Sequence, residues 1–124
     1  MTVCVIPARG GSKRIPRKNI KNFFGKPIIA WSIEAAQKAK IFSKIIVSTD
    51  DKEIASISES LGADIPFMRP NEIADDYSTT VDVMAHACSW MKENGFSSSI
   101  ACCLYPTAPF IYPNDLKKAL NLIE

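Results

Sequence analysis

The chain has 124 residues, of which 47% are hydrophobic and 23% are charged, a composition typical of a soluble globular protein. The formal net charge of +2 excludes a protein-wide affinity for nucleic acid or anionic membranes. No apolar stretch reaches the ~18 residues that a membrane-spanning helix needs, and the start of the chain lacks the apolar segment of a signal peptide. We therefore expect a cytoplasmic protein in which residues 1–124 form one domain.

The predicted elements alternate between strands and helices. Short apolar runs predict strands at residues 3–6, 44–48, 63–67 and 98–104. Apolar residues at helical spacing predict a helix after each strand. The first covers residues 27–40, and the last begins at Asn114. The second runs from a cap at Thr49 or Asp50 to Gly62, and the third runs from a cap at Ser78 or Thr79 to Asn94-Gly95. This alternation implies a three-layer α/β/α fold with a mostly parallel, Rossmann-like sheet.

The loop at residues 8–25 carries most of the information about function. Seven cationic residues and no acid lie between positions 9 and 26, and the rest of the chain, with eight basic and 13 acidic residues, carries −5. A glycine-rich turn after a strand also exposes backbone N–H groups that favour an anion. The loop therefore predicts a polyphosphate ligand. Its cations are Arg9, Lys13, Arg14, Arg17, Lys18, Lys21 and Lys26.

The loop does not match the common phosphate-binding motifs. Both G-x-x-x-x-G-K-[ST] and G-x-G-x-x-G are absent, which argues against a P-loop or a dinucleotide fingerprint. An RNA-binding surface is an alternative, but the nearby aromatics, Phe23 and Phe24, are expected to pack rather than to stack on bases. Residues 48–51 and 105–109 also follow strands, so we expect all three segments to meet at the carboxyl edge of the sheet.

The remaining candidate groups suggest no chemistry of their own. Cys4, Cys88, Cys102 and Cys103 contain no C-x-x-C pair and are expected to be small buried hydrophobes in a reducing cytosol. The only histidine, His86, lies in a helical stripe, and we do not expect it to be a general base.

Residues 6–20, Ile-Pro-Ala-Arg-Gly-Gly-Ser-Lys-Arg-Ile-Pro-Arg-Lys-Asn-Ile, resemble the signature of the cytidylyltransferases that activate nonulosonic acids such as sialic and pseudaminic acid. Val-Ser-Thr-Asp at 47–50, Phe-Met-Arg-Pro at 67–70, Asp-Asp-Tyr-Ser-Thr-Thr at 75–80 and Pro-Thr-Ala-Pro at 106–109 follow in the family's order. The resemblance implies a nucleotide-diphospho-sugar transferase fold. It also implies transfer of CMP from CTP to a sugar acid, with release of pyrophosphate and use of Mg²⁺.

The same resemblance implies roles for individual residues. Arg9, Lys13 and Lys18 match catalytic positions, where cations stabilise charge on the α-phosphate and the leaving pyrophosphate. For Arg69 a surface ion pair with Glu72 or Asp75 is the alternative, and for Thr80 a helix cap. The matched CTP-binding positions are Arg9, Gly10, Gly11, Ser12, Lys13, Lys18, Asn19, Arg69 and Thr80.

Tyr105 and Thr107 are the expected sugar contacts. Sialic acid enzymes commonly carry a glutamine where this chain has Tyr105, so the sugar pocket is expected to differ from theirs. Together with Phe110 and Ile111, the tyrosine is more similar to the pseudaminic acid branch, because an apolar patch suits a methyl group better than a hydroxyl. An acylneuraminate acceptor, or packing of Tyr105 in the core, are the alternatives.

The family normally extends well beyond the length of this chain. The further part supplies a dimerisation element and the carboxylates that hold Mg²⁺, so this chain resembles the N-terminal, nucleotide-binding portion. A homodimer is then expected of the full-length enzyme, and a CTP-binding fragment without catalysis is an alternative. Asp50 and Asp51 are expected to cap a helix and to complement its dipole. The metal ligands stay unassigned, and neither a nucleic acid nor a membrane is expected as a partner.

Overall fold

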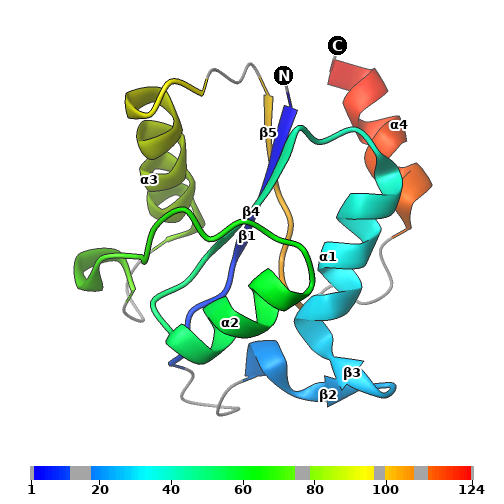
Figure 1. The fold of residues 1–124 in the computed structure, drawn as a ribbon. Coiled ribbons are helices and arrows are strands. Elements are labelled where there is room, and N and C mark those ends of the chain that lie inside the picture. The colour runs from blue at the N-terminus through cyan, green and yellow to red at the C-terminus, as the bar shows by residue number, and fades with distance from the viewer. Residues whose placement is uncertain (1, 12–17, 75–78, 97–99, 108–111, 124) are drawn as a thin grey trace.

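The computed structural model describes residues 2–11, 18–74, 79–96, 100–107 and 112–123. Its central sheet contains β1 (Thr2–Pro7), β4 (Lys44–Ser48) and β5 (Ile100–Cys103), in the order β4-β1-β5 (Figure 1). All pairings in this sheet are parallel, with Cys4 of β1 opposite Ile45 of β4 and Cys102 of β5. Parallel strands need crossover connections, and the helices between these strands provide them.

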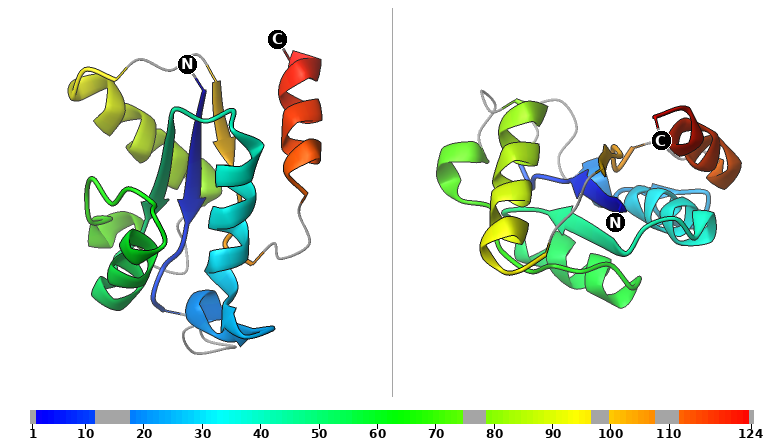
Figure 2. Two further views of the ribbon diagram at one scale, coloured as in Figure 1. Left: turned by 45° about the vertical axis from the view of Figure 1, so that its right-hand side comes forward. Right: turned by 90° about the horizontal axis from the view of Figure 1, so that it is seen from above.

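Helices cover both faces of the sheet (Figure 2). On one face, Cys4 and Ile6 of β1 pack with Ile29 and Ile33 of α1 (Ile28–Ala39), and Ile54 of α2 (Lys52–Ser60) joins the same cluster. Because alternate strand residues point to opposite faces, β1 is buried on both sides.

The opposite face is covered by α3 (Thr80–Glu93). Val3 of β1 and Ile46 of β4 pack there against Met91, with Phe67 and Trp90 around them. The remaining helix, α4 (Pro113–Ile123), lies beside α1 (Figure 1). The predicted three-layer α/β/α arrangement is therefore confirmed. In the described ranges, no helix combines the length and apolarity needed to cross a membrane.

Local side-chain signals set the ends of two helices. Thr79 caps α3 through a reciprocal capping box, in which its Oγ1 accepts from the Asp82 N–H and the Asp82 carboxylate accepts from the Thr79 N–H, both at 3.1 Å. Asp51, rather than Thr49 or Asp50, caps α2, because its Oδ1 accepts from the Glu53 and Ile54 N–H groups at 2.9 and 3.0 Å.

Two segments differ from the prediction. Residues 63–67 form no strand in the described chain, and Asp64 makes only an isolated parallel bridge to Ile46. Pro66 has no N–H with which to extend that pairing. The 3₁₀ turns η1 (Lys18–Ile20) and η2 (Asn71–Ile73) were also not predicted.

The loop before α1 also contains a β-hairpin that the sequence did not suggest. It pairs β2 (Asn22–Phe23) with β3 (Lys26–Pro27), and φ is positive at both turn residues, +49° at Phe24 and +88° at Gly25. This turn leaves Phe24 78% exposed, and its ring packs edge-on against Phe23 with the ring centroids 4.6 Å apart.

The cysteines also differ from the expectation. Only Cys4 is buried, whereas Cys102 and Cys103 are half-buried and Cys88 is exposed.

Candidate functional site

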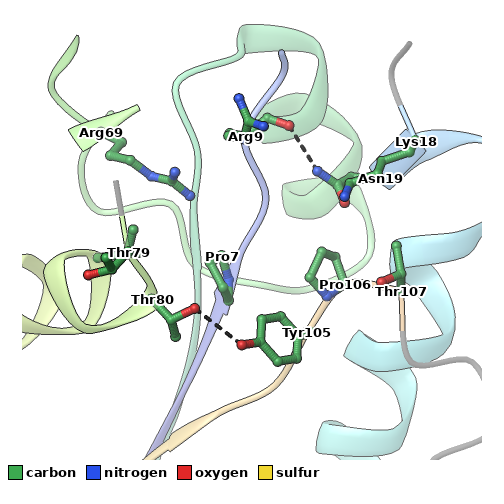
Figure 3. Close-up of a pocket in the computed structure, with 11 residues that line it drawn as sticks. Pro7, Arg9, Lys18, Asn19, Arg69, Thr79, Thr80, Tyr105, Pro106 and Thr107 are labelled. Carbon is green, nitrogen blue, oxygen red and sulfur yellow. Dashed lines mark hydrogen bonds between the residues drawn. The ribbon is translucent and has the colours of Figure 1, made fainter. Parts of the chain in front are cut away.

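A pocket of about 170 Å³ opens beyond the carboxyl ends of β1 and β5, the edge at which a parallel sheet is expected to bind ligands. We call it the strand-end pocket. In Figure 3, residues from η1 lie on one side of it and the start of α3 lies on the other. Of the predicted site residues, it brings together Arg9, Lys18, Asn19, Arg69, Thr80, Tyr105 and Thr107.

The charged side chains that are described in the lining of the strand-end pocket are all positive. Arg9, Lys18 and Arg69 line it, and the described part of its lining contains no acidic side chain. Like charges that share a pocket repel one another unless an anion lies between them, and arginine forks suit phosphate oxygens. The electrostatics therefore favour a phosphate-bearing ligand.

Arg69 is held at the pocket by the end of β4. Its side chain is only 5% exposed, and it donates from Nη2 to the Ser48 carbonyl at 2.7 Å and from Nε to the Ser48 Oγ at 3.2 Å. The alternative of a surface side chain is therefore wrong. Burial lowers the pKa of the Arg69 guanidinium, the Asp50 carboxylate opposes this, and Arg9 adds to it. An arginine starts so far above neutrality that Arg69 remains a cation at pH 7.

The glycine turn after β1 is fixed by the two aspartates that follow β4. The Gly10 N–H donates to Asp50 Oδ1 at 2.8 Å. A Cβ on Gly10 would lie 2.6 Å from Asp51 Oδ2, whereas a Cβ on Gly11 would meet only an Arg9 nitrogen at 3.7 Å. The third expected segment, residues 48–51, thus acts on the site through its contacts with Gly10 and Arg69. The hydrogen bond from Gly10 to Asp50 was not predicted from the sequence.

Asn19 ties η1 to the end of β1. Its side chain is 3% exposed, and its Nδ2 donates to the Arg9 carbonyl at 2.8 Å (Figure 3). Its Oδ1 is buried and accepts no hydrogen bond from the described residues. A buried acceptor without a partner costs roughly 1–3 kcal/mol. Asn19 therefore offers an unused acceptor at the edge of the strand-end pocket.

The expected nucleotide and sugar contacts meet at Thr80 and Tyr105. The Thr80 Oγ1 and the Tyr105 hydroxyl lie 3.2 Å apart and share a hydrogen bond (Figure 3). Thr79 is the helix cap, so the alternative cap role for Thr80 is wrong. Tyr105 is 55% exposed, which excludes packing of its ring in the core, and its carbonyl is held by the Ser32 hydroxyl at 2.8 Å.

Three candidate residues are not among those that line the described pocket: Ser12, Lys13 and His86. Ser12 and Lys13 lie outside the described residues. His86 packs its ring against Phe67 at 4.7 Å and does not line the strand-end pocket. The described residues contain no group of three or more His, Cys, Asp or Glu side chains that could hold a metal ion.

The sequence of this chain matches a known protein family. A family model described as cytidylyltransferase matches residues 3–124. The chain belongs to the cytidylyltransferase family. Among its relatives, the pseudaminic acid cytidylyltransferase of Campylobacter jejuni is 46% identical over 117 residues, which cover 94% of this chain and 50% of that protein.

A second relative and a solved structure are also similar to this chain. The N-acylneuraminate cytidylyltransferase of Escherichia coli is 37% identical over 122 residues, covering 98% of this chain and 28% of that protein. The structure of CMP:2-keto-3-deoxy-manno-octonic acid synthetase complexed with CTP superimposes with a TM-score of 0.81 at 27% identity, over 98% of this chain and 46% of that one. The chain thus spans about half the length of the Campylobacter relative and less of the Escherichia relative.

Proposed function

We propose that this chain is the nucleotide-binding part of an enzyme that transfers CMP from CTP to a nonulosonic sugar acid, with pseudaminic acid as the acceptor. The observation that carries the proposal is the strand-end pocket, where Arg9, Lys18 and Arg69 converge with Thr80 and Tyr105. Membership of the cytidylyltransferase family and the similarity to a pseudaminic acid enzyme support the choice of CTP and of the acceptor.

The chemistry that we propose is an in-line displacement. The anomeric hydroxyl of the sugar acid attacks the α-phosphate of CTP, a new P–O bond forms, and the bond to the β-phosphate breaks to release pyrophosphate. The hydroxyl proton passes to solvent, and no covalent enzyme intermediate is needed. Arg9 and Lys18, with Lys13, stabilise the charge on the phosphates, which is the main task of a protein in phosphoryl transfer.

The other residues position the substrates. Asn19 and Thr80 present hydrogen-bonding groups to the nucleotide, and Arg69 offers a buried cation whose geometry is set by Ser48. The glycine turn at Gly10, together with Gly11 and Ser12, supplies backbone donors for the phosphates. Tyr105 and Thr107 face the sugar.

Mg²⁺ belongs to the proposal as the cofactor that neutralises the phosphates. The described residues do not form a site for it. Asp51 is engaged as the α2 cap, Asp50 accepts the Gly10 N–H, and no cluster of three or more ligating side chains is present among the described residues. We therefore derive no step through a protein-bound metal. The expected cytoplasmic location and the homodimer of the full-length enzyme stay predictions.

Calorimetry with CTP tests the nucleotide site. We expect the chain to bind CTP in preference to ATP, and Arg9→Ala to weaken CTP binding at least tenfold, which corresponds to ~1.4 kcal/mol. Lys117→Ala, on the exposed side of α4, is the matched control and should leave the affinity unchanged. Equal binding of CTP by the wild type and the Arg9→Ala variant would contradict the proposed role of the pocket.

A pyrophosphate-release assay on the same sample separates enzyme from binding fragment. Turnover with CTP and pseudaminic acid, and slower turnover with N-acetylneuraminic acid, supports the proposed acceptor. CTP binding without turnover indicates a nucleotide-binding part that needs further chain. Tight binding of oligonucleotides with a steep salt dependence would instead favour the RNA-binding alternative.

A further inference from the structure

Two cysteines lie side by side in the central sheet, and neither lines the strand-end pocket. Cys4 of β1 and Cys102 of β5 are register partners in a parallel pairing, so their side chains leave the sheet on the same face. Neighbouring strands lie about 4.8 Å apart, which is within the range of about 4.4–6.8 Å that a disulfide requires between its Cα atoms. Both cysteines are free thiols, and a hydrogen bond joins their side chains. The register therefore places this pair at disulfide distance.

The two thiols differ in their access to small molecules. Cys4 is wholly buried and belongs to the same core cluster as Ile29 of α1. Cys102 is half-buried and lines a pocket of about 140 Å³ between β5 and α4, which we call the α4 pocket (Figure 2). Apart from Cys102 and Thr2, the described lining of the α4 pocket is apolar. A small molecule in this pocket therefore meets the Cys102 sulfur, whereas the Cys4 sulfur lies behind it in the core.

The two thiols also differ in acidity. The hydrogen bond from Cys4 lowers the pKa of the Cys102 thiol to about 7, although the partial burial of Cys102 opposes this shift. The same hydrogen bond, together with burial, raises the pKa of Cys4, which therefore keeps its proton. Because a thiolate is a far better nucleophile than a thiol, Cys102 is the reactive member of the pair at neutral pH. Cys4 is a neutral thiol beside it.

We propose that Cys102 is a site of oxidation by hydroperoxides and that Cys4 converts its oxidised form into a Cys4–Cys102 disulfide. The Cys102 thiolate attacks one oxygen of the hydroperoxide, an S–O bond forms, the O–O bond breaks, and the leaving oxygen takes a proton from solvent. The Cys4 sulfur then attacks the sulfur of the Cys102 sulfenic acid. The new S–S bond forms as the S–O bond breaks, and the departing hydroxide takes the Cys4 proton and leaves as water. The two sulfurs together lose the two electrons that the hydroperoxide gains.

The second step makes the modification reversible. A sulfenic acid that meets no thiol can be oxidised further to a sulfinic acid, which ordinary thiols do not reduce. A disulfide is instead reduced by exchange with another thiol. Cys4 therefore protects Cys102 from irreversible oxidation. The proposed disulfide is independent of the proposed nucleotide chemistry, because both cysteines lie outside the strand-end pocket.

Cys103 and Cys88 are the competing partners of Cys102, and their positions argue against them. Cys103 follows Cys102 in β5, so its side chain points to the opposite face of the sheet, and burial raises the pKa of its thiol. Cys88 is exposed on α3, which covers the face of the sheet opposite to Cys4. Of the four cysteines, only Cys4 and Cys102 share a face as register partners.

Hydrogen peroxide tests the assignment on the reduced chain. The treated protein is alkylated in denaturant, and peptide mass spectrometry then identifies disulfide pairs and remaining thiols. We expect the wild type to form a Cys4–Cys102 link within one molecule, and dithiothreitol to remove it. Cys88→Ser and Cys103→Ser are the matched controls, and each should form this link at a rate within twofold of the wild type.

Two variants separate the roles of the two thiols. In Cys102→Ser, Cys4 should lose its thiol to peroxide at least tenfold more slowly than in the wild type. In Cys4→Ala, the Cys102 sulfenic acid should accumulate, and dimedone should trap at least fivefold more of it than in the wild type. Urea unfolding checks that both variants are folded, and Cys102→Ser, whose altered side chain is only half-buried, decides the test if Cys4→Ala does not fold.

The proposal is overturned if Cys4 is oxidised as fast in Cys102→Ser as in the wild type, or if dimedone traps equal amounts in Cys4→Ala and the wild type. It is also overturned if the wild type links Cys102 to Cys103 or Cys88 instead, or if peroxide forms no disulfide within the molecule.

Discussion

Replacing Gly10 by alanine tests how the glycine turn after β1 is held in place. The backbone at Gly10 has no positive φ, so the need for glycine comes from space and not from conformation. An alanine Cβ would lie 2.6 Å from Asp51 Oδ2 and 2.8 Å from Asp51 Cβ. Asp51 cannot move away cheaply, because its Oδ1 is hydrogen bonded to the first turn of α2.

The expected cost of Gly10→Ala follows from the contacts that must break. Displacing Asp51 loses an N-cap, about 0.5–2 kcal/mol. Shifting the turn instead loses the Gly10–Asp50 hydrogen bond, about 0.5–1.5 kcal/mol. We expect Gly10→Ala to lower the free energy of unfolding by about 1–3 kcal/mol, measured by urea denaturation followed by circular dichroism.

Two matched variants make this test specific. Gly11→Ala places its Cβ in open space apart from one ordinary contact, so the free energy of unfolding should change by less than ~0.5 kcal/mol. Asp51→Gly removes all three atoms that the alanine would meet, and glycine is a tolerable cap. In that background Gly10→Ala should cost clearly less than in the wild type. An equal cost in both backgrounds, or no cost in the wild type, would refute the reasoning.

Three further predictions follow from other contacts. Thr79→Ala should lower the free energy of unfolding, measured in urea, by about 1 kcal/mol because the α3 cap is lost. Thr80→Val should change the free energy of unfolding by less than ~0.5 kcal/mol but should weaken CTP binding, measured by calorimetry. Arg69→Lys should cost roughly 1–3 kcal/mol of stability, because an ammonium cannot make the bonds of a guanidinium fork to a buried carbonyl. The hydrogen bond from Cys4 lowers the pKa of the Cys102 thiol to about 7. Because the thiolate is the reactive form, the rate of Cys102 alkylation should increase as the pH rises through about 7, which mass spectrometry can follow. Cys4→Ala should move the midpoint of this pH dependence to a higher pH.

Much of the architecture was predictable because its signals are local. The strand at Lys44–Ser48 was predicted with the observed bounds, and Thr79 was one of two predicted caps for α3. These signals act over only a few positions of the chain. An apolar run predicts a strand, a threonine three residues before an aspartate predicts a helix start, and a glycine predicts a helix end. The hairpin was missed because Phe24 occupies a turn position that usually holds Asn, Asp or Gly.

The sequence by itself determined the order of the elements, the local concentration of positive charge and the resemblance to a family. It could not determine which side chains would meet, because those contacts join residues far apart along the chain. The Gly10–Asp50 bond spans 40 positions, the Thr80–Tyr105 bond spans 25, and Arg69 reaches back 21 positions to Ser48. Only the packing of parallel strands brings their carboxyl ends together, and that packing decided that Asp50 holds the glycine turn and that Arg69 is buried.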